Sequence, residues 1–321
     1  MSLAPLIETM NQKFKGKDFL TIKDFTKEEL TDLIDLALKL KQMQKEGKAH
    51  RYLEGKTLAM IFEKSSTRTR VSFETGMYQL GGMAQFLSSN DLQLGNGETI
   101  ADTARTLDRY VDGMMIRTYG HEIVEEMAEY TTVPVINGLT DSAHPCQILT
   151  DLMTIYEKKA SFSSLKFAYV GDGNNVSNSL IMGCAIMGID CYIGVPEGYE
   201  IEEELLTEAK KRAAESGSVV KQLNDPKEAT EDADIIYTDV WASMGFEAEQ
   251  AERAKAFKDY QVNDDLVKNA KEDYLFMHCL PARRGEEVSA SVIDGKNSVV
   301  FDQAENRLHA QKAVLASLMY S

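Results

Sequence analysis

The sequence has few cysteines, no long apolar run and a shortage of basic residues, and each shortage excludes a class of protein. The four cysteines lie far apart in apolar segments without a Cys-x-x-Cys pair, so we expect neither a disulfide framework nor a metal site. No stretch approaches the roughly 20 apolar residues of a membrane helix, and the opening MSLAPLIETMNQKF lacks a secretory core. We therefore expect a cytoplasmic protein with no membrane partner.

Acidic side chains outnumber basic ones by 51 to 35, which gives a formal net charge of −16. Such a charge repels nucleic acid, which is therefore not an expected partner. Any anionic ligand would need a local basic pocket. The 43% of apolar and 27% of charged residues are ordinary for a globular protein, and a length of 321 residues favours two domains.

Short apolar runs alternate with helical patterns, which is typical of an α/β fold with mainly parallel sheets. A first helix is predicted after Thr26, which forms a capping box with Glu29. The first half has predicted strands at 57–62, 84–89, 113–119 and 133–136, and helices at 67–80, 99–109 and 121–130. The second half has predicted strands at 165–171, 191–196, 235–240, 275–279 and 299–301, and helices near 175–187, 202–216, 247–258 and 263–271.

The turn-rich stretch 137–142 ahead of His144 predicts the joint between two α/β domains. We place the first domain at residues 1–145 and the second at residues 146–303.

The segment Ser65-Ser66-Thr67-Arg68-Thr69-Arg70 lies where an apolar strand gives way to a helix. The first N–H groups of a helix are unpaired and its dipole is positive there, so adjacent hydroxyl and guanidinium groups complete an anion site that suits phosphate. A capped helix start, with Ser66 as N-cap and two surface arginines, explains the same residues. The segment alone leaves both interpretations open.

Further polar clusters follow other predicted strands, and open parallel sheets bind ligands at the carboxyl ends of their strands. These clusters are Arg117-Thr118, His144-Pro145-Cys146-Gln147, 171–175, 238–241 and His278-Cys279-Leu280-Pro281. One cleft between two domains would account for all of them together.

Arg68 and Arg117 could hold a phosphate by forked hydrogen bonds, although a structural ion pair accounts equally well for either. His144 and Gln147 lie three residues apart at a helix start, so an imidazole and a carboxamide could face one ligand. A histidine that fills a loop position is the alternative.

The run 171–175 suggests a dinucleotide site, but Val176 stands where the GxGxxG pattern needs its third glycine. Asn175 instead offers a carboxamide to a small polar molecule. Asp239 closes a strand and suits a cationic amine, with an N-cap aspartate as the alternative. Ser243 in the following loop suits a flexible lid. We assign Cys279 to contact and orientation, since most cysteines in apolar runs are unreactive.

Four of these motifs together resemble one family, the aspartate/ornithine carbamoyltransferases. They are Ser66-Thr67-Arg68-Thr69-Arg70, His144-Pro145-Cys146-Gln147, Asp239-Val240-Trp241-Ala242-Ser243-Met244-Gly245 and His278-Cys279-Leu280-Pro281. The resemblance runs from about residue 17 to the end in the family's order. The first motif marks the family broadly, whereas the third and fourth together resemble its ornithine-using members.

The resemblance implies two three-layer α/β domains, a first for carbamoyl phosphate and a second for ornithine, with helix 304–321 returning to the first. It implies an active site in the interdomain cleft that transfers the carbamoyl group of carbamoyl phosphate to the δ-amine of L-ornithine. The products are citrulline and phosphate, in arginine metabolism, and neither a metal nor an organic cofactor is implied.

The resemblance also implies site residues. Carbamoyl phosphate would contact Ser66, Thr67, Arg68, Thr69, Gln93, Arg117, His144, Gln147, Cys279, Leu280 and Arg307. Ornithine would contact Asn175, Asp239, Ser243 and Met244. Catalysis would involve Arg68, Arg117, His144, Asp239 and Cys279. Gln93 matches a position that enters the neighbouring subunit's site, which implies a homotrimer with shared active sites, and the Leu280–Pro281 bond matches one that is cis.

The δ-amine must attack while neutral, yet a pKa near 10.4 leaves only about one molecule in a thousand neutral at pH 7.4. The site must therefore select or generate the neutral amine. A putrescine carbamoyltransferase is the nearest alternative, although putrescine lacks the α-amino and α-carboxylate groups that the 243–245 loop would contact. A nucleotide-dependent oxidoreductase and a non-catalytic amine-binding relative are rivals from other classes. The sequence does not indicate whether citrulline is made or consumed in the cell.

Overall fold

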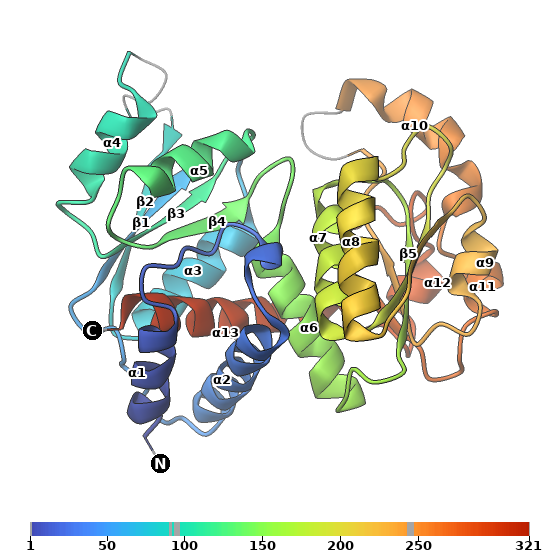
Figure 1. Cartoon of the computed structure of the whole chain (residues 1–321). Helices are drawn as coiled ribbons and strands as arrows, with labels where there is room; N and C mark the ends of the chain where they lie inside the picture. The colour runs from blue at the N-terminus through green and yellow to red at the C-terminus, as the bar shows by residue number, and fades with distance from the viewer. Residues whose placement is uncertain (1, 90–91, 93–96, 243–246, 321) are drawn as a thin grey trace. The chain divides into compact units, whose positions relative to one another are not determined.

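The computed structural model describes residues 2–89, 92, 97–242 and 247–320 (Figure 1). The chain divides into two compact units, a first made of Met1–Met153 with Glu305–Ser321 and a second made of Thr154–Ala304. Both divisions fall inside helices. The boundary expected after residue 145 lies at the start of the helix Pro145–Lys159, whereas the units divide later in that helix.

The first unit contains a four-stranded sheet, all parallel, in the order β2-β1-β3-β4. Its strands are β1 (Thr57–Phe62), β2 (Met83–Ser88), β3 (Gly113–Arg117) and β4 (Val135–Leu139). Its helices are α1 (Ala4–Lys13), α2 (Lys27–Lys45), α3 (Thr67–Gln79), α4 (Ile100–Leu107), α5 (His121–Glu129), the start of α6 (Pro145–Lys159) and most of α13 (Val300–Met319), with a 3₁₀ turn at Ile22–Asp24. Figure 1 shows α4 and α5 on one side of this sheet and α3 and α13 on the other.

The central strands β1 and β3 are buried on both faces because helices cover both. Ala59 and Ile61 of β1 share one core with Val124 of α5, whereas Leu58 and Met60 are buried on the other face. Strands buried on both faces read as unbroken apolar runs rather than as an alternating pattern. This is why β1 and β3 were predictable from the sequence.

The second unit contains a five-stranded parallel sheet in the order β7-β6-β5-β8-β9. Its strands are β5 (Lys166–Val170), β6 (Asp190–Gly194), β7 (Val220–Leu223), β8 (Ile235–Thr238) and β9 (Leu275–His278). Its helices are α7 (Asn175–Met187), α8 (Glu203–Ser216), α9 (Pro226–Thr230), α10 (Gln250–Ala256), α11 (Asp264–Val267) and α12 (Ala290–Ile293), with 3₁₀ turns at Glu247–Glu249 and Lys258–Tyr260. Helices α7 and α8 lie together on one side of β5, with α9, α11 and α12 on the other (Figure 1). Two α/β units with parallel sheets confirm the predicted fold class, and the capping box of Thr26 and Glu29 is also confirmed.

Several predicted elements are wrong. The segment 299–301 is not a strand, because the Val299 N–H bonds to the Phe276 carbonyl and Gln303 then bonds back to Val299, which begins α13. The final helix therefore starts before residue 304. Strand β7 was missed because Val220 is the only buried residue of this edge strand.

The predicted helix at 263–271 is shorter than expected, because its last residues bond to another segment. Asn269 accepts from the Asp232 N–H and Lys271 donates to the Ala233 carbonyl, so these residues pair with the chain ahead of β8. Residues 137–139 form the end of β4 rather than a turn, since buried Asn137 donates its side-chain N–H to the Leu20 carbonyl. The described residues contain no helix with the length and apolar character needed to cross a membrane.

Each sheet has one position where the chain order reverses. In the first unit this position lies between β1 and β3, and in the second between β5 and β8. The connections from two such strands leave toward opposite faces of the sheet, so a crevice forms at their carboxyl ends, where ligands bind in open α/β sheets. The polar clusters predicted from the sequence after β1, β3, β5 and β8 occupy these two positions.

Candidate active site

Helix α3 begins directly after β1 and is capped by Ser66. The Ser66 hydroxyl accepts the Thr69 N–H at 3.2 Å and lies 3.1 Å from the Thr69 hydroxyl. The predicted N-cap is therefore confirmed, while Thr67 at the first helical position is exposed. The cap orients the first turn so that its free N–H groups and hydroxyls lie at the carboxyl edge of the sheet.

The two arginines of this turn have different surroundings. Arg70 is exposed, pairs with Glu74 at 3.1 Å and lies 3.7 Å from the centre of the Phe86 ring, as the surface interpretation expected. Arg68 is half-buried and acts on His144, whose pKa its charge helps to lower. Arg70 thus fits the capped-helix interpretation, whereas anion binding by Arg68 stays a prediction.

Arg307 of α13 joins three other predicted residues. Its guanidinium donates to the Gln147 carboxamide oxygen at 2.7 Å and to the Thr69 hydroxyl at 3.0 Å, and it lies 3.4 Å from His144 Nε2. All four side chains are buried. Gln147 in turn donates to Asp151 at 2.8 Å, which fixes the orientation of its carboxamide.

Positive charge converges on the His144 imidazole. Burial lowers its pKa well below the usual value of 6.5, and the charges of Arg307, Arg117 and Arg68 lower it further. The ring is therefore neutral at physiological pH. Arg117 is buried at the end of β3, and its carbonyl accepts the Glu63 N–H at 2.8 Å, which joins β3 to the chain ahead of α3. Three guanidiniums around one neutral ring attract an anion.

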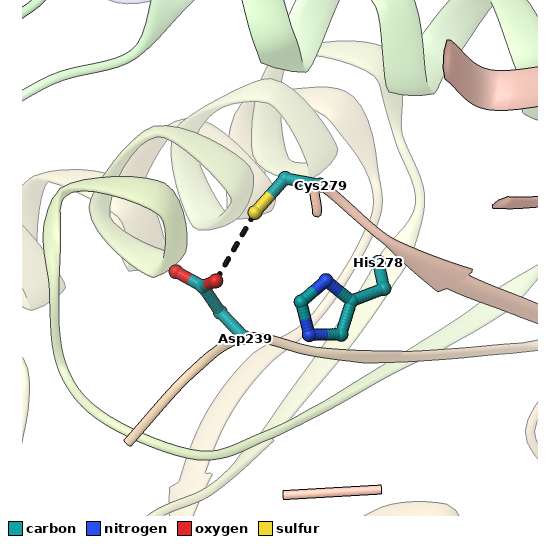
Figure 2. Close-up of side chains that lie close together, drawn as sticks. All are labelled: Asp239, His278 and Cys279. Atoms are coloured by element: carbon teal, nitrogen blue, oxygen red, sulfur yellow. Dashed lines mark hydrogen bonds between the residues drawn. The ribbon is translucent and has the colours of Figure 1, made fainter. Parts of the chain in front are cut away.

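The second unit brings a carboxylate, a thiol and a carboxamide together, of which the carboxylate and the thiol are drawn in Figure 2. Asp239, just after β8, accepts from Cys279 Sγ at 3.1 Å and from the Asn174 carboxamide at 2.9 Å. Asp239 also accepts the Val240 N–H at 2.8 Å, so its contacts are not those of an N-cap for α10. Asn175 begins α7 and is half-buried.

His278, drawn beside Asp239 and Cys279 in Figure 2, is engaged at both ring nitrogens. Its Nδ1 accepts the Leu280 N–H at 2.8 Å, so its Nε2 carries the proton and donates to buried Glu287 at 3.1 Å. Asp239, His278 and Cys279 offer ligand atoms within 4.8 Å of one another. With both nitrogens engaged, the imidazole instead holds the turn at Leu280, whose bond to the following proline is cis, as the resemblance implied.

Gly173, in the loop after β5, allows two backbone segments to pack closely. A Cβ at Gly173 would lie 2.6 Å from the backbone of Glu200. The Gly173 N–H donates to the Tyr199 carbonyl at 2.9 Å. The N–H groups of Val176 and Ser177 at the start of α7 donate to the Asn174 side chain and so are not available to a ligand. This arrangement argues against the dinucleotide interpretation.

Three groups near the two sites were given no individual role from the sequence. Asn174 orients Asp239, Arg253 of α10 pairs with Asp172 at 2.7 Å, and buried Lys64 pairs with Asp141 beside the turn into α3. Burial raises the pKa of Asp172 to about 6, against the lowering effect of Arg253. The partners of these pairs are far apart in sequence, so no local pattern reveals them.

Gln93, Ser243 and Met244 lie outside the described residues.

The fold and the two clusters define a class: an α/β protein of two units, with a guanidinium-rich cluster in one unit and a carboxylate with a thiol in the other. The chain belongs to the aspartate/ornithine carbamoyltransferase family. Residues 17–157 match the model of the family's carbamoyl-P binding domain, and residues 163–318 match that of its Asp/Orn binding domain.

Named relatives are similar over almost the whole chain. An ornithine carbamoyltransferase of Anoxybacillus flavithermus is 59% identical over 97% of this chain and 99% of its own length. An anabolic ornithine carbamoyltransferase of Pyrococcus furiosus is 60% identical over 95% of this chain and 96% of its own. A solved structure of ornithine carbamoyltransferase from Pyrococcus furiosus has a TM-score of 0.93, at 60% identity over 95% of this chain and 98% of its own.

Proposed function

We propose that this chain transfers the carbamoyl group of carbamoyl phosphate to the δ-amine of L-ornithine, giving L-citrulline and phosphate. The observation that carries the proposal is the convergence of Arg68, Arg117 and Arg307 on neutral His144 beside the first turn of α3. The names of the relatives support ornithine over putrescine as the amine.

The first unit would bind carbamoyl phosphate. Ser66, Thr67, Arg68 and Thr69 would hold the phosphate with the free N–H groups of α3, since a helix N-terminus favours an anion. The carbamoyl group would contact Arg117, His144, Gln147 and Arg307. The guanidiniums would stabilise negative charge on the tetrahedral intermediate and on the departing phosphate, which can accept the amine proton.

The second unit would bind ornithine. The carboxylate of Asp239 suits the α-ammonium group, and Asn175, Ser243 and Met244 would complete the contacts. Cys279, 3.1 Å from Asp239, would lie beside the δ-amine, and both Cys279 and Leu280 would contact carbamoyl phosphate. Transfer requires that the neutral amine of ornithine reach the carbonyl carbon of carbamoyl phosphate. A polar cluster at the carboxyl ends of the strands in each unit supports one substrate site per unit.

Incubation with carbamoyl phosphate and either ornithine or putrescine tests the function. We expect citrulline to form with ornithine and little carbamoylputrescine with putrescine, because the latter has no α-ammonium group for Asp239. Preferential carbamoylation of putrescine would contradict the proposal, and so would the absence of product from both amines.

The same assay tests the phosphate site with two neighbouring arginines. Arg68→Ala should lower kcat/KM by at least about a hundredfold, in the range found when one transition-state donor is removed. Arg70→Ala is the matched control, because Arg70 pairs with Glu74 and stacks on Phe86. Equal losses in the two variants, with intact folding by circular dichroism, would contradict the role of Arg68.

We further propose a homotrimer with shared active sites, to which Gln93 would contribute. Four large apolar side chains, called here the β2 patch, support an interface between copies: Val71 and Tyr78 of α3, and Met83 and Phe86 of edge strand β2. Their exposed fractions are 53%, 75%, 53% and 37%. An apolar group of this kind beside a sheet edge is typical of an interaction surface.

Two observations support a proposal for the place of the reaction in the cell. All four cysteines are free thiols, which fits a reducing compartment, so we propose the cytoplasm. The name of the Pyrococcus furiosus relative, an anabolic enzyme, supports a role in arginine biosynthesis.

A further inference from the structure

Arg253 of α10 joins segments that surround Asp239. Its Nη1 donates to the Asp172 carboxylate at 2.7 Å and to the Trp241 carbonyl at 3.0 Å. Its Nε donates to Glu249 at 3.0 Å, and its guanidinium lies 5.1 Å from the Tyr199 ring centre. One buried side chain thus bonds to the loop after β5 and to the chain after β8.

Trp241, two residues after Asp239, is held at two points. Its carbonyl accepts from Arg253, and its ring stacks on Phe257 at 5.9 Å with an interplanar angle of 25°. Phe257 caps α10, four residues after Arg253. The direction in which the chain leaves Asp239 therefore depends on α10 through both main-chain and side-chain contacts.

The other partner of Arg253 lies beside the second hydrogen bond of Asp239. Asp172 precedes Asn174 by two residues, and the Asn174 carboxamide donates to Asp239. Asp172 is buried, and both burial and the nearby charge of Asp239 raise its pKa. Two buried carboxylates repel each other, and the positive charge of Arg253 offsets this repulsion. Loss of Arg253 would leave a buried carboxylate without its cation next to the loop that orients Asp239.

We propose that Arg253 is a positioning residue for the amine substrate, which fixes Asp239 and Asn174 by holding Asp172 and the Trp241 carbonyl. The inference rests on the proposed function, because it takes Asp239 as the group that binds the α-ammonium of ornithine. In this proposal Arg253 acts through Asp239 and Asn174. Its removal should therefore weaken ornithine binding and leave the carbamoyl-phosphate site of the first unit unchanged.

Steady-state kinetics with both substrates varied tests the role. Arg253→Met should raise the KM for ornithine about tenfold or more. A tenfold rise corresponds to a loss of about 1.4 kcal/mol of binding free energy. The KM for carbamoyl phosphate should stay within about twofold, because that site lies in the other unit. Arg253→Lys keeps the charge but not the fork of donors, so we expect an intermediate KM for ornithine. It also serves as the folded variant if Arg253→Met does not fold.

Asp234→Asn is the matched control. Asp234 is also a buried aspartate of the second unit, pairs with Lys271 at 2.8 Å and accepts the Lys166 N–H at 2.9 Å. It lies ahead of β8, at the opposite end of the strand that Asp239 follows. This variant should lower Tm but leave the KM for ornithine unchanged, which separates a structural effect from a positioning effect.

Two results would overturn the inference while the proposed function stands. One is an unchanged KM for ornithine in both Arg253 variants, and the other is an equal rise in the KM of both substrates. A wild-type protein that forms no citrulline would overturn the proposed function itself, and the role of Arg253 with it.

Discussion

At the scale of single residues, His144 illustrates how neighbours set a protonation state. An isolated histidine ionises near pH 6.5, but burial and three guanidiniums keep this ring neutral in the folded protein. The neutral ring can share a hydrogen bond with Arg307 at 3.4 Å, which an imidazolium could not. The sequence showed His144 and two of the arginines at strand ends. The charge state of His144, however, depends on how close the three guanidiniums lie to its ring, which the sequence does not show.

This charge state predicts a pH dependence of stability. The folded-state pKa of His144 is lowered, so the unfolded chain binds the extra proton as the pH falls below about 6.5. The stability due to His144 is therefore complete above that pH and is lost toward the folded-state pKa. We expect the Tm of the wild type to fall more steeply from pH 7.5 to pH 5 than that of His144→Gln, measured by differential scanning fluorimetry. Parallel curves for the two proteins would refute this account.

At the scale of elements, a second polar contact holds α13, the helix that carries Arg307, against α3. Lys312 makes this contact, about one turn after Arg307. Lys312 is fully buried, donates to Gln79 of α3 at 2.8 Å and lies 3.1 Å from His50 Nε2. A Cβ at Gly76 would lie 3.3 Å from the Lys312 stem, so glycine allows α3 and α13 to approach closely. The helix that carries Arg307 is thus packed on the helix that carries Arg68.

Lys312 predicts a second effect of pH on stability, at alkaline rather than acidic pH. Burial lowers its pKa from 10.5 to about 8. Between about pH 8 and pH 10.4 the unfolded chain binds this proton and the folded chain does not, so stability rises with pH in that range. The stability gained at high pH is lost as the pH falls through 8. The Tm of the wild type should therefore increase relative to that of Lys312→Met between pH 7 and pH 10. A constant difference between the two Tm values would contradict the assignment.

The elements differ in how well the sequence predicted them. β1 and α3 were clear, because an unbroken apolar run is followed directly by a capped helix. β7 was missed, because an edge strand buries too little to show a pattern. The chain at 299–301 was misread as a strand, since a short apolar run has the same composition at a helix start, and only its pairing with Phe276 and Gln303 decides.

At the scale of the whole molecule, the β2 patch predicts assembly. Charges placed on it by Val71→Glu with Met83→Glu should dissociate the proposed trimer, because burying an unpaired carboxylate in an interface is costly. Phe301→Glu is the control, since Phe301 is 71% exposed but belongs to the second unit and is not one of the four patch residues. Light scattering coupled to size-exclusion chromatography measures the mass. A wild-type monomer, or dissociation by the control as well, would refute the assignment.

The sequence by itself determined the α/β class, the capped start of α3 and the family, because these depend on local periodicity and on motifs whose residues are contiguous. It also showed polar residues at strand ends, since a strand end is a local feature. Only the tertiary structure decided which of them meet. Arg307 reaches Thr69 and Gln147 because α13 packs on α3, and Arg253 of α10 reaches Asp172 in the loop after β5. These contacts depend on the packing of whole elements, which no local pattern records.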